Sequence, residues 1–253
     1  MAIEKFNFES LNRFSALILG ESGAGKTTLI STIPENQSAL IFSVKKESGL
    51  MSVKDMLEAA RDGKRQAPVE VRTIETWADM NGAMKMLEDK RCRDKYDWVF
   101  FDSLTAIGDS CLEYMQSMYK HGLEAFGRFS EAMERFIIRA RDMTDYIMVF
   151  TCLAKLIDGM DKEEKRYAPV LPGQKLSDKV VSLFDEVMFI TSKVNGKNPS
   201  RVIITDSYEG YPGKTRSRKL EYFEEPDLTV IAGKILGWKA EAPAEAEEPK
   251  EKK

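Results

Sequence analysis

Short apolar runs alternate along this chain with longer segments in which apolar residues recur every three or four positions. We expect the apolar runs to form strands at residues 15–19, 38–43, 97–102 and 146–151. Residues 69–74 alternate between apolar and polar side chains, which predicts a further strand. Strands that are apolar on both faces are typical of a parallel sheet that helices cover on two sides.

The segments between these strands show helical spacing. We expect helices at residues 27–33, 51–62, 77–92, 104–143, 177–184 and 228–238. Gly108, Gly122 and Gly127 are expected to divide the longest of these segments into shorter helices.

Two strands in the C-terminal part of the chain are expected to pair as a hairpin. Residues 186–192 and 201–205 flank Asn195-Gly196, a dipeptide typical of tight antiparallel turns. With the alternation of strands and helices, this predicts an α/β fold with a mostly parallel central sheet, helices on both faces and an antiparallel edge hairpin. The polar stretch 155–175 holds nine charged residues and is longer than a compact fold needs, so we expect a functional or a disordered loop.

The composition limits the function classes only broadly. A formal net charge of −3 over 253 residues argues against a histone-like binder but not against a local basic groove. Cys92, Cys111 and Cys152 lack the spacing of a metal site, so we expect buried reduced thiols. No apolar run approaches the roughly 18 residues of a membrane span, and the N-terminus has no apolar signal region. We therefore expect a cytoplasmic protein without a membrane partner.

The end of the chain differs in composition from the rest. Residues 240–253 are of low complexity, carry an excess of Glu over Lys and hold few apolar side chains. We expect one domain over residues 1–239, followed by a disordered acidic tail. Such a tail either recruits a partner protein or only keeps the chain soluble.

The first apolar run leads into GESGAGKTT, residues 20–28. This sequence matches G-x-x-x-x-G-K-[ST], a loop whose backbone N–H groups surround phosphate oxygens between a strand and a helix. Lys26 would reach the β- and γ-phosphates and the Thr27 hydroxyl would bind Mg²⁺, so ATP and Mg²⁺ are the expected cofactors. The residues expected around the phosphates are Gly20, Glu21, Ser22, Gly23, Ala24, Gly25, Lys26, Thr27 and Thr28.

Three further residues are candidates for the same site. Asp102 ends a predicted strand, where a second Mg²⁺ ligand is expected, and a helix N-cap is a compatible second role. Glu47 follows the second strand and would orient the attacking water, with a solvated loop charge as the alternative. Thr151 ends the strand that follows Asp102 and would sense the γ-phosphate, with a simple turn residue as the alternative.

Several motifs resemble those of a known family. Residues 101–107, FDSLTAI, resemble the second nucleotide motif of RecA-type recombinases, and residues 47–50, ESGL, are similar to the segment with their catalytic glutamate. Segments 171–176, 184–187 and 210–216 resemble the small, core-only RecA-like ATPases of bacteriophages, some of which act in single-strand annealing and recombination. The resemblance extends over most of the chain and implies a RecA-like P-loop NTPase fold.

The resemblance also implies an active site shared between subunits. Family members supply a Lys-x-Arg pair to the γ-phosphate bound by the neighbouring subunit, and Lys214 and Arg216 match that pattern. Residues 191–220 hold seven Lys or Arg against two acids, which suits contact with an anion but also an ordinary solvated basic hairpin. Arg218 is a rival for the role of the arginine. A homo-oligomer with nucleotide at the subunit interface is therefore expected.

Single-stranded DNA is the partner that the resemblance implies. Family loops that follow the sheet strands bind single strands through basic and aromatic side chains, here Lys155, Lys162, Lys165, Arg166, Tyr167 and Lys175. A second candidate group, with ordinary helix surface as its alternative, is Tyr119, Lys120, His121, Phe126 and Arg128. The acidic tail would recruit a single-strand-binding or other recombination protein.

Three function classes follow from these observations. The leading expectation is an ATP-hydrolysing enzyme, stimulated by single-stranded DNA, in phage-type recombination, annealing or replication. An ATP-switched adaptor or loader would need neither a base such as Glu47 nor the pair Lys214 and Arg216. A small-molecule P-loop kinase would need an arginine-rich lid, and no clear lid is visible in the sequence.

Overall fold

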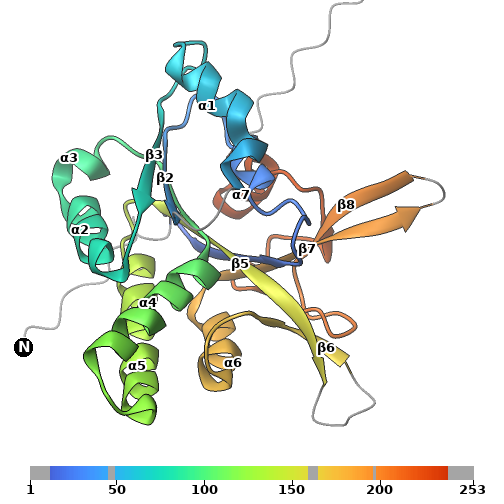
Figure 1. The fold of residues 1–253 in the computed structure, drawn as a ribbon. Coiled ribbons are helices and arrows are strands. Elements are labelled where there is room, and N and C mark those ends of the chain that lie inside the picture. The colour runs from blue at the N-terminus through green and yellow to red at the C-terminus, as the bar shows by residue number, and fades with distance from the viewer. Residues whose placement is uncertain (1–11, 45–48, 159–164, 196–197, 239–253) are drawn as a thin grey trace, which may run out of the picture.

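The computed structural model describes residues 12–44, 49–158, 165–195 and 198–238. Its centre is a mostly parallel sheet (Figure 1). The parallel strands are β1 (Ser15–Gly20), β2 (Ala39–Val44), β3 (Val69–Ile74), β4 (Trp98–Asp102), β5 (Ile147–Asp158) and β7 (Glu186–Asn195). They lie in the order β7-β1-β5-β4-β2-β3, so the two strands that end in the predicted phosphate loop and in Asp102 flank β5.

Antiparallel strands extend this sheet at the β7 side. β8 (Asn198–Ile204) pairs with β7, and β10 (Phe223–Glu224) pairs with β8. The short β9 (Lys214–Thr215) pairs with the first residues of β7, and β6 (Lys165–Pro169) pairs with the far half of β5. The expected fold class, a mostly parallel sheet with an antiparallel edge hairpin, is confirmed.

Helices cover both faces of the sheet, as the apolar strands require. Alternate side chains of β1 point to opposite faces: Leu17 and Leu19 belong to one apolar core, and Ala16 and Ile18 to the other. The first core includes α2 (Trp77–Glu88), α4 (Leu104–Met118), α5 (Gly122–Arg141) and α6 (Gln174–Leu183), with the short α3 (Lys90–Arg93) at its rim. The second includes η2 (Thr28–Thr32), η3 (Gly49–Val53), α1 (Lys54–Arg61) and α7 (Leu228–Leu236).

The predicted division of residues 104–143 is partly wrong. The break between α4 and α5 falls at residues 119–121, just before Gly122, whereas Gly108 and Gly127 lie inside helices. A Cβ at Gly108 would lie 3.2 Å from Leu171 Cδ2 and 3.3 Å from Pro172 Cδ. This glycine therefore allows a close approach between α4 and the segment before α6, and it does not end a helix.

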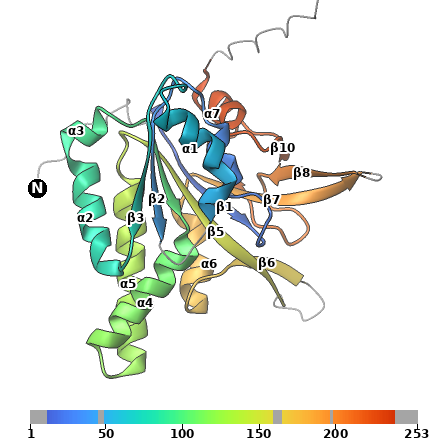
Figure 2. The same cartoon turned by 45° about the horizontal axis from the view of Figure 1, so that its top comes forward.

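The polar stretch 155–175 is largely ordered, against the expectation of a loop. β5 continues beyond Thr151 to Asp158 and returns as β6, so the two strands form an antiparallel arm. Figure 2 shows this arm and the β7–β8 hairpin projecting from the same side of the molecule. Residues 159–164, which include Lys162, lie outside the described residues.

Two expectations drawn from composition can be compared with the structure. Cys92, Cys111 and Cys152 are all buried and form no disulfide, which agrees with the predicted buried thiols. Burial raises the pKa of the Cys111 thiol to about 12. In the described part of the chain, no helix combines the length and the apolarity needed to span a membrane. The tail after residue 238 lies outside the described residues.

Candidate nucleotide site

The glycine-rich loop follows β1 at the carboxyl edge of the sheet. Gly23 and Gly25 have φ angles of 77° and 105°, a region that L-residues with a side chain rarely adopt. A Cβ at Gly20 would lie 2.7 Å from the carbonyl oxygen of Ile190, because β7 passes close to the end of β1. These glycines therefore let the backbone curl and let the neighbouring strand approach.

The helix expected after the loop is shorter than predicted. η2 is a five-residue 3₁₀ helix over Thr28–Thr32, and Ile33 is extended with a ψ of 152°. Pro34 explains this end, because its ring disfavours helical geometry in the residue before it. The helix after the loop is therefore a single short turn, which limits the contribution of its dipole to phosphate binding.

The Lys26 side chain is folded back across the loop. It is only 8% exposed, and its Nζ donates hydrogen bonds to the carbonyl oxygens of Gly20 at 2.9 Å and Glu21 at 2.8 Å. An ammonium group with little exposure and several backbone partners is held in one position. Glu21, Ser22 and Gly23 are exposed beside it, and Ala24 N donates to Glu21 O across the turn.

Asp102 connects the loop with the strand ends. Its carboxylate is 4% exposed, and Thr27 Oγ1 donates to Oδ2 at 3.0 Å. The hydroxyl of Thr151, which is fully buried, donates to the other oxygen, Oδ1. The register explains the contact: Phe101 pairs with Phe150, and Ile18 pairs with Thr151, so Thr151 lies beside the last residues of β4 and β1. The expectation that Thr151 ends its strand is wrong, because β5 continues to Asp158.

The oxygen atoms of Thr27 and Asp102 fit the ligands of Mg²⁺. This ion prefers oxygen ligands and is usually held by one or two carboxylates together with substrate phosphates. A hydroxyl and a carboxylate 3.0 Å apart beside a phosphate loop supply such ligands. Ser103 Oγ, one residue on, accepts a hydrogen bond from the backbone of Ala106, so the N-cap of α4 is Ser103 and not Asp102.

Glu47, the predicted base, lies outside the described residues. Its neighbour Gly49 is described and contacts the site. A Cβ at Gly49 would lie 3.0 Å from Thr27 Oγ1 and 3.5 Å from Asp102 Oδ2. Gly49, two residues after Glu47 in the sequence, therefore lies against the predicted metal ligands.

Arg201, on β8, also lies against the loop, although no sequence motif singled it out. A Cβ at Gly25 would lie 2.9 Å from Arg201 Nη1. The signal that could have found it is the register of β8 on β7. This register sets how far Arg201 lies along the hairpin, and β7 is the strand beside β1. That register depends on the position of the turn and was not visible from the hydrophobic pattern.

Lys214 and Arg216 lie at the amino-terminal ends of the parallel strands, whereas the loop lies at their carboxyl ends. The backbone N–H of Arg216 donates to Asp185 O, and Asp185 is bonded in turn to Ser15, the first residue of β1. The loop begins at Gly20, five residues further along β1, which corresponds to roughly 17 Å at about 3.3 Å per residue. These side chains therefore do not contact phosphates bound by their own subunit.

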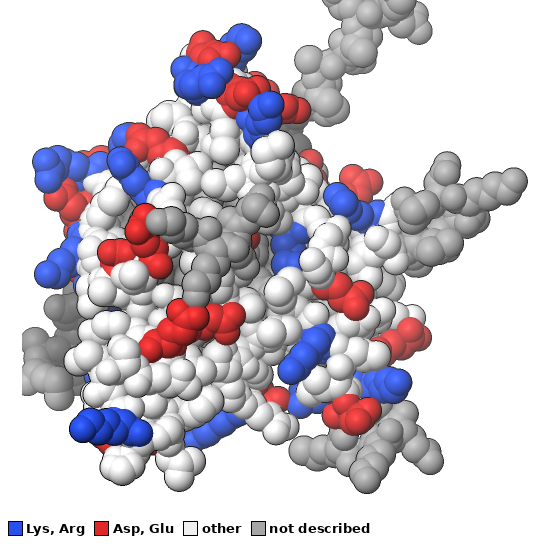
Figure 3. Space-filling model, viewed as in Figure 1, with Lys and Arg blue, Asp and Glu red and all other residues white. Residues whose placement is uncertain are grey.

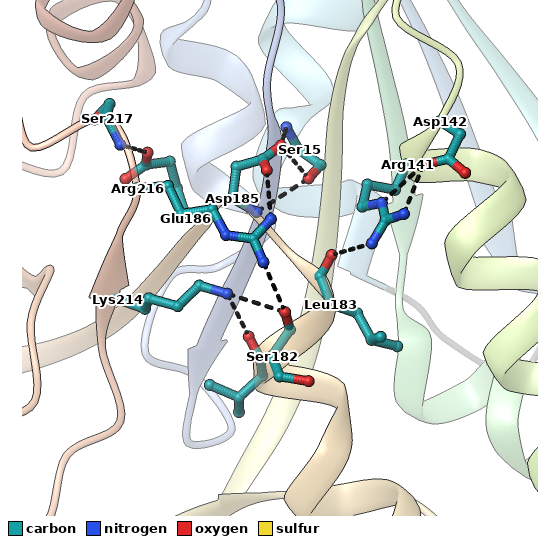
Figure 4. Close-up of polar contacts among 11 residues, drawn as sticks. Ser15, Arg141, Asp142, Ser182, Leu183, Asp185, Glu186, Lys214, Arg216 and Ser217 are labelled. Atoms are coloured by element: carbon teal, nitrogen blue, oxygen red, sulfur yellow. Dashed lines mark hydrogen bonds and ion pairs between the residues drawn. The ribbon is translucent and has the colours of Figure 1, made fainter. Parts of the chain in front are cut away.

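In the isolated subunit the two cations bind the end of α6 (Figure 4). Lys214 Nζ donates to Val181 O at 3.1 Å and Ser182 O at 3.2 Å. Arg216 donates to Ser182 O at 3.2 Å and forms an ion pair of 3.0 Å with Asp185. Cations at a helix C-terminus compensate its free carbonyl groups, so both side chains also have a structural role.

Burial shifts the pKa values of two ionisable groups near the amino-terminal end of β7, Lys214 and Glu186. Burial and the nearby Arg216 lower the pKa of Lys214. Burial also raises the pKa of Glu186, which is 1% exposed and accepts a hydrogen bond from the backbone of Ser217 at 3.0 Å. Arg218, the rival arginine, is exposed and has a φ of 54°.

The first group of predicted DNA-binding residues lies on and beside the β5–β6 arm. Lys155, Lys165 and Lys175 are exposed, while Arg166 pairs with Asp178 at 2.8 Å. Tyr167, expected to stack on a base, is already stacked on Tyr211, with ring centroids 4.9 Å apart, and also packs against Phe189. It is half-buried because its side chain faces the sheet. The Tyr167 ring is therefore not free to stack on a base in this structure.

The second group surrounds the turn between α4 and α5. Arg128 lies over the ring of Tyr119, 5.8 Å from its centroid, and Phe126 packs edge-on against the buried Phe129. Lys120 and His121 form the turn itself. These contacts suit the alternative of ordinary helix surface and core.

Comparison with known proteins places this geometry in context. A family model described as an AAA domain matches residues 12–217, which covers the phosphate loop, Asp102, Thr151 and Lys214. The match supports a P-loop ATPase of the AAA type that binds nucleotide. A search of curated proteins gave no match.

Proposed function

The chain belongs to the AAA domain family, and from this we propose that it hydrolyses ATP in assemblies on single-stranded DNA. The proposed setting is phage-type recombination, annealing or replication in the cytoplasm of a bacterial host. The observation that carries the ATPase part is the meeting of Lys26, Thr27 and Asp102 at one edge of the sheet.

The roles of these residues follow from their chemistry. Lys26 supplies a positive charge to the terminal phosphates, and the backbone of residues 20–28 surrounds them. Thr27 and Asp102 would hold Mg²⁺, which lowers the charge on the transferring phosphoryl group when bound. Thr151 fixes the orientation of the Asp102 carboxylate through the hydrogen bond to Oδ1.

Glu47 is proposed as the residue that orients the attacking water. The support is the position of Gly49, two residues after Glu47, against Thr27 and Asp102. A carboxylate near the metal ligands can accept a proton from a water aligned with the γ-phosphate.

Lys214 and Arg216 are proposed to act on the nucleotide of a neighbouring copy. They lie about one strand length from their own phosphate loop; Lys214 is partly buried and Arg216 is exposed. A contact in trans would require Arg216 to break its ion pair with Asp185. The arginine side chain of this pair is 52% exposed. Exposed pairs of this kind are worth about 1 kcal/mol or less, so release of this ion pair has a low cost.

Single-stranded DNA is proposed to bind along the β5–β6 arm. Lys155 and Lys165 are exposed there, and neither forms an ion pair with an acidic side chain among the described residues. Figure 3 shows positive and negative side chains interspersed around this side of the molecule. We therefore expect moderate, strongly salt-dependent affinity, since phosphate contacts release counterions. The tail after residue 239 is proposed to recruit a single-strand-binding or other recombination protein.

The test is the rate of ATP hydrolysis with and without single-stranded DNA, at 50 and 200 mM salt. The proposal predicts magnesium-dependent hydrolysis that DNA stimulates at low salt and less at high salt, and that Lys26→Ala abolishes. If DNA does not stimulate hydrolysis and the protein does not retain DNA, the DNA-binding part of the proposal is rejected. ATP binding without hydrolysis would favour the adaptor, and phosphoryl transfer to a metabolite would favour the kinase.

A further inference from the structure

The β7–β8 hairpin carries one arginine to the level of the phosphate loop. Ile203 of β8 pairs with Ile190 of β7, and the carbonyl of Ile190 lies against Gly20 at the end of β1. Arg201 lies two residues before Ile203 and pairs with Ser192, so it stands beyond the end of β1, beside the loop.

The alternation of side chains also directs Arg201 to the correct face. Ile203 is fully buried in the same apolar core as Leu29 and Ile30 of η2, the helix that follows the loop. Residues two apart in a strand share a face, so Arg201 is on the loop side of β8. Val202, between them, faces the other way.

The guanidinium group lies flat against the loop. Its atoms Nη1, Cζ and Nε would be 2.9, 3.0 and 3.1 Å from a Cβ at Gly25. Three atoms of one planar group at nearly equal distances show that its face, and not its edge, is against this residue. Gly25 precedes Lys26 directly, within the segment whose N–H groups are expected to bind phosphate.

The charge of Arg201 is not used elsewhere in the described structure. Its side chain is exposed, and no hydrogen bond or ion pair joins it to another residue in the part of the chain that the structure describes. By contrast, Arg166 and Arg216 are each paired with an aspartate. Arginine presents its donors in a planar fork that matches phosphate oxygens in bidentate contacts.

We propose that Arg201 is a phosphate-binding residue that acts in cis on the triphosphate held by the loop of its own subunit. It adds a second side-chain cation to Lys26, and it is separate from Lys214 and Arg216, which would act on another copy. The inference rests on the proposed binding of ATP by this loop. Its consequence is that the β7–β8 hairpin is part of the nucleotide site.

The experiment measures binding of ATP, ADP and inorganic tripolyphosphate to wild-type protein, Arg201→Gln and Arg201→Lys by isothermal titration with Mg²⁺. A lost charge-assisted contact reduces affinity by about tenfold or more. We expect that loss for Arg201→Gln with ATP and with tripolyphosphate, which has no base, and a smaller loss for Arg201→Lys. The matched control is Arg72→Gln, an exposed arginine on β3 at the other edge of the same sheet, and it should bind as wild type does.

The outcomes separate this inference from the proposed function. If wild-type protein binds none of the three ligands, the nucleotide-binding function itself fails. If wild type and Arg72→Gln bind while Arg201→Gln binds equally well, only the role of Arg201 is overturned.

A second measurement needs no variant, which covers the case in which a variant does not fold. Phenylglyoxal modifies accessible arginines, and mass spectrometry of the Arg201 peptide gives the rate at this one position. We expect Mg²⁺ and ATP to slow modification of Arg201 several-fold while Arg72 reacts unchanged. Equal rates at Arg201 with and without ATP, under conditions where ATP is bound, would overturn the proposal.

Discussion

Replacing Thr151 by valine removes one hydroxyl from the centre of the site and keeps the shape of the side chain. Thr151 is fully buried and donates to Asp102, whose carboxylate is 4% exposed. A hydrogen bond to a charged group contributes about 1.5–3 kcal/mol, and more is at stake when the carboxylate left behind is buried. We therefore expect the free energy of unfolding to fall by about 1.5–3 kcal/mol for Thr151→Val.

Urea unfolding followed by circular dichroism measures this loss. For a domain of this size the same change corresponds to a fall in Tm of about 3–12 °C. The matched control is Thr205→Val, because Thr205 is 1% exposed and donates to an uncharged carbonyl, that of Glu221. Loss of a neutral hydrogen bond is expected to reduce stability by only about 0.5–1.5 kcal/mol.

A double-mutant cycle then isolates the pair. If the hydroxyl stabilises the Asp102 carboxylate, Thr151→Val and Asp102→Asn should couple by about 0.5–3 kcal/mol, since contacting residues are not additive. Two results would refute the reasoning: a loss at Thr151 no larger than that at Thr205, or full additivity of Thr151→Val with Asp102→Asn.

Three further predictions address neighbouring features. Gly20→Ala places a Cβ 2.7 Å from Ile190 O, so we expect a loss of about 1–3 kcal/mol in urea unfolding, whereas Gly82→Ala, with open space around its Cβ, should cost nothing. Burial raises the pKa of Glu186 above 4.5, so wild-type protein loses stability as the pH rises from 4.5 through the raised pKa. Glu186→Gln should therefore unfold at higher urea than wild type at pH 8 but not at pH 4, and an equal difference at both values would contradict this. Asp102→Ala should raise the Mg²⁺ concentration for half-maximal hydrolysis about tenfold or more, and an unchanged Mg²⁺ titration would remove Asp102 from the metal site.

The centre of the site could be predicted from the sequence because its geometry follows from few rules. The loop motif fixes the positions of Lys26 and Thr27, and a parallel sheet brings the carboxyl ends of neighbouring strands together. Asp102 ends β4, and Thr151 directly follows Phe150, the β5 residue that pairs with Phe101, so the parallel register alone brings the two side chains together. The strand at 69–74 was also predicted with its observed bounds, since its alternation is clear.

Other parts depend on tertiary contacts that the local pattern does not contain. The β5–β6 arm is made of polar residues, and only the pairing of Lys155 with Ala168 and its neighbours makes it a hairpin. The position of Arg201 against Gly25 depends on the register of β8 on β7. Gly108 looked like a helix break, whereas its lack of a side chain serves packing against Leu171.

The central claim is that each nucleotide site is completed by a second copy of the chain, and subunit mixing tests it most directly. Arg216→Ala and Glu47→Gln should each be inactive alone, because each lacks one half of the site. In a one-to-one mixture, about a quarter of head-to-tail interfaces combine an intact Glu47 with an intact Arg216, so hydrolysis should return to about that fraction of wild type. Co-purification of differently tagged variants confirms that mixed assemblies form. Mixed assemblies that hydrolyse no ATP would contradict the account.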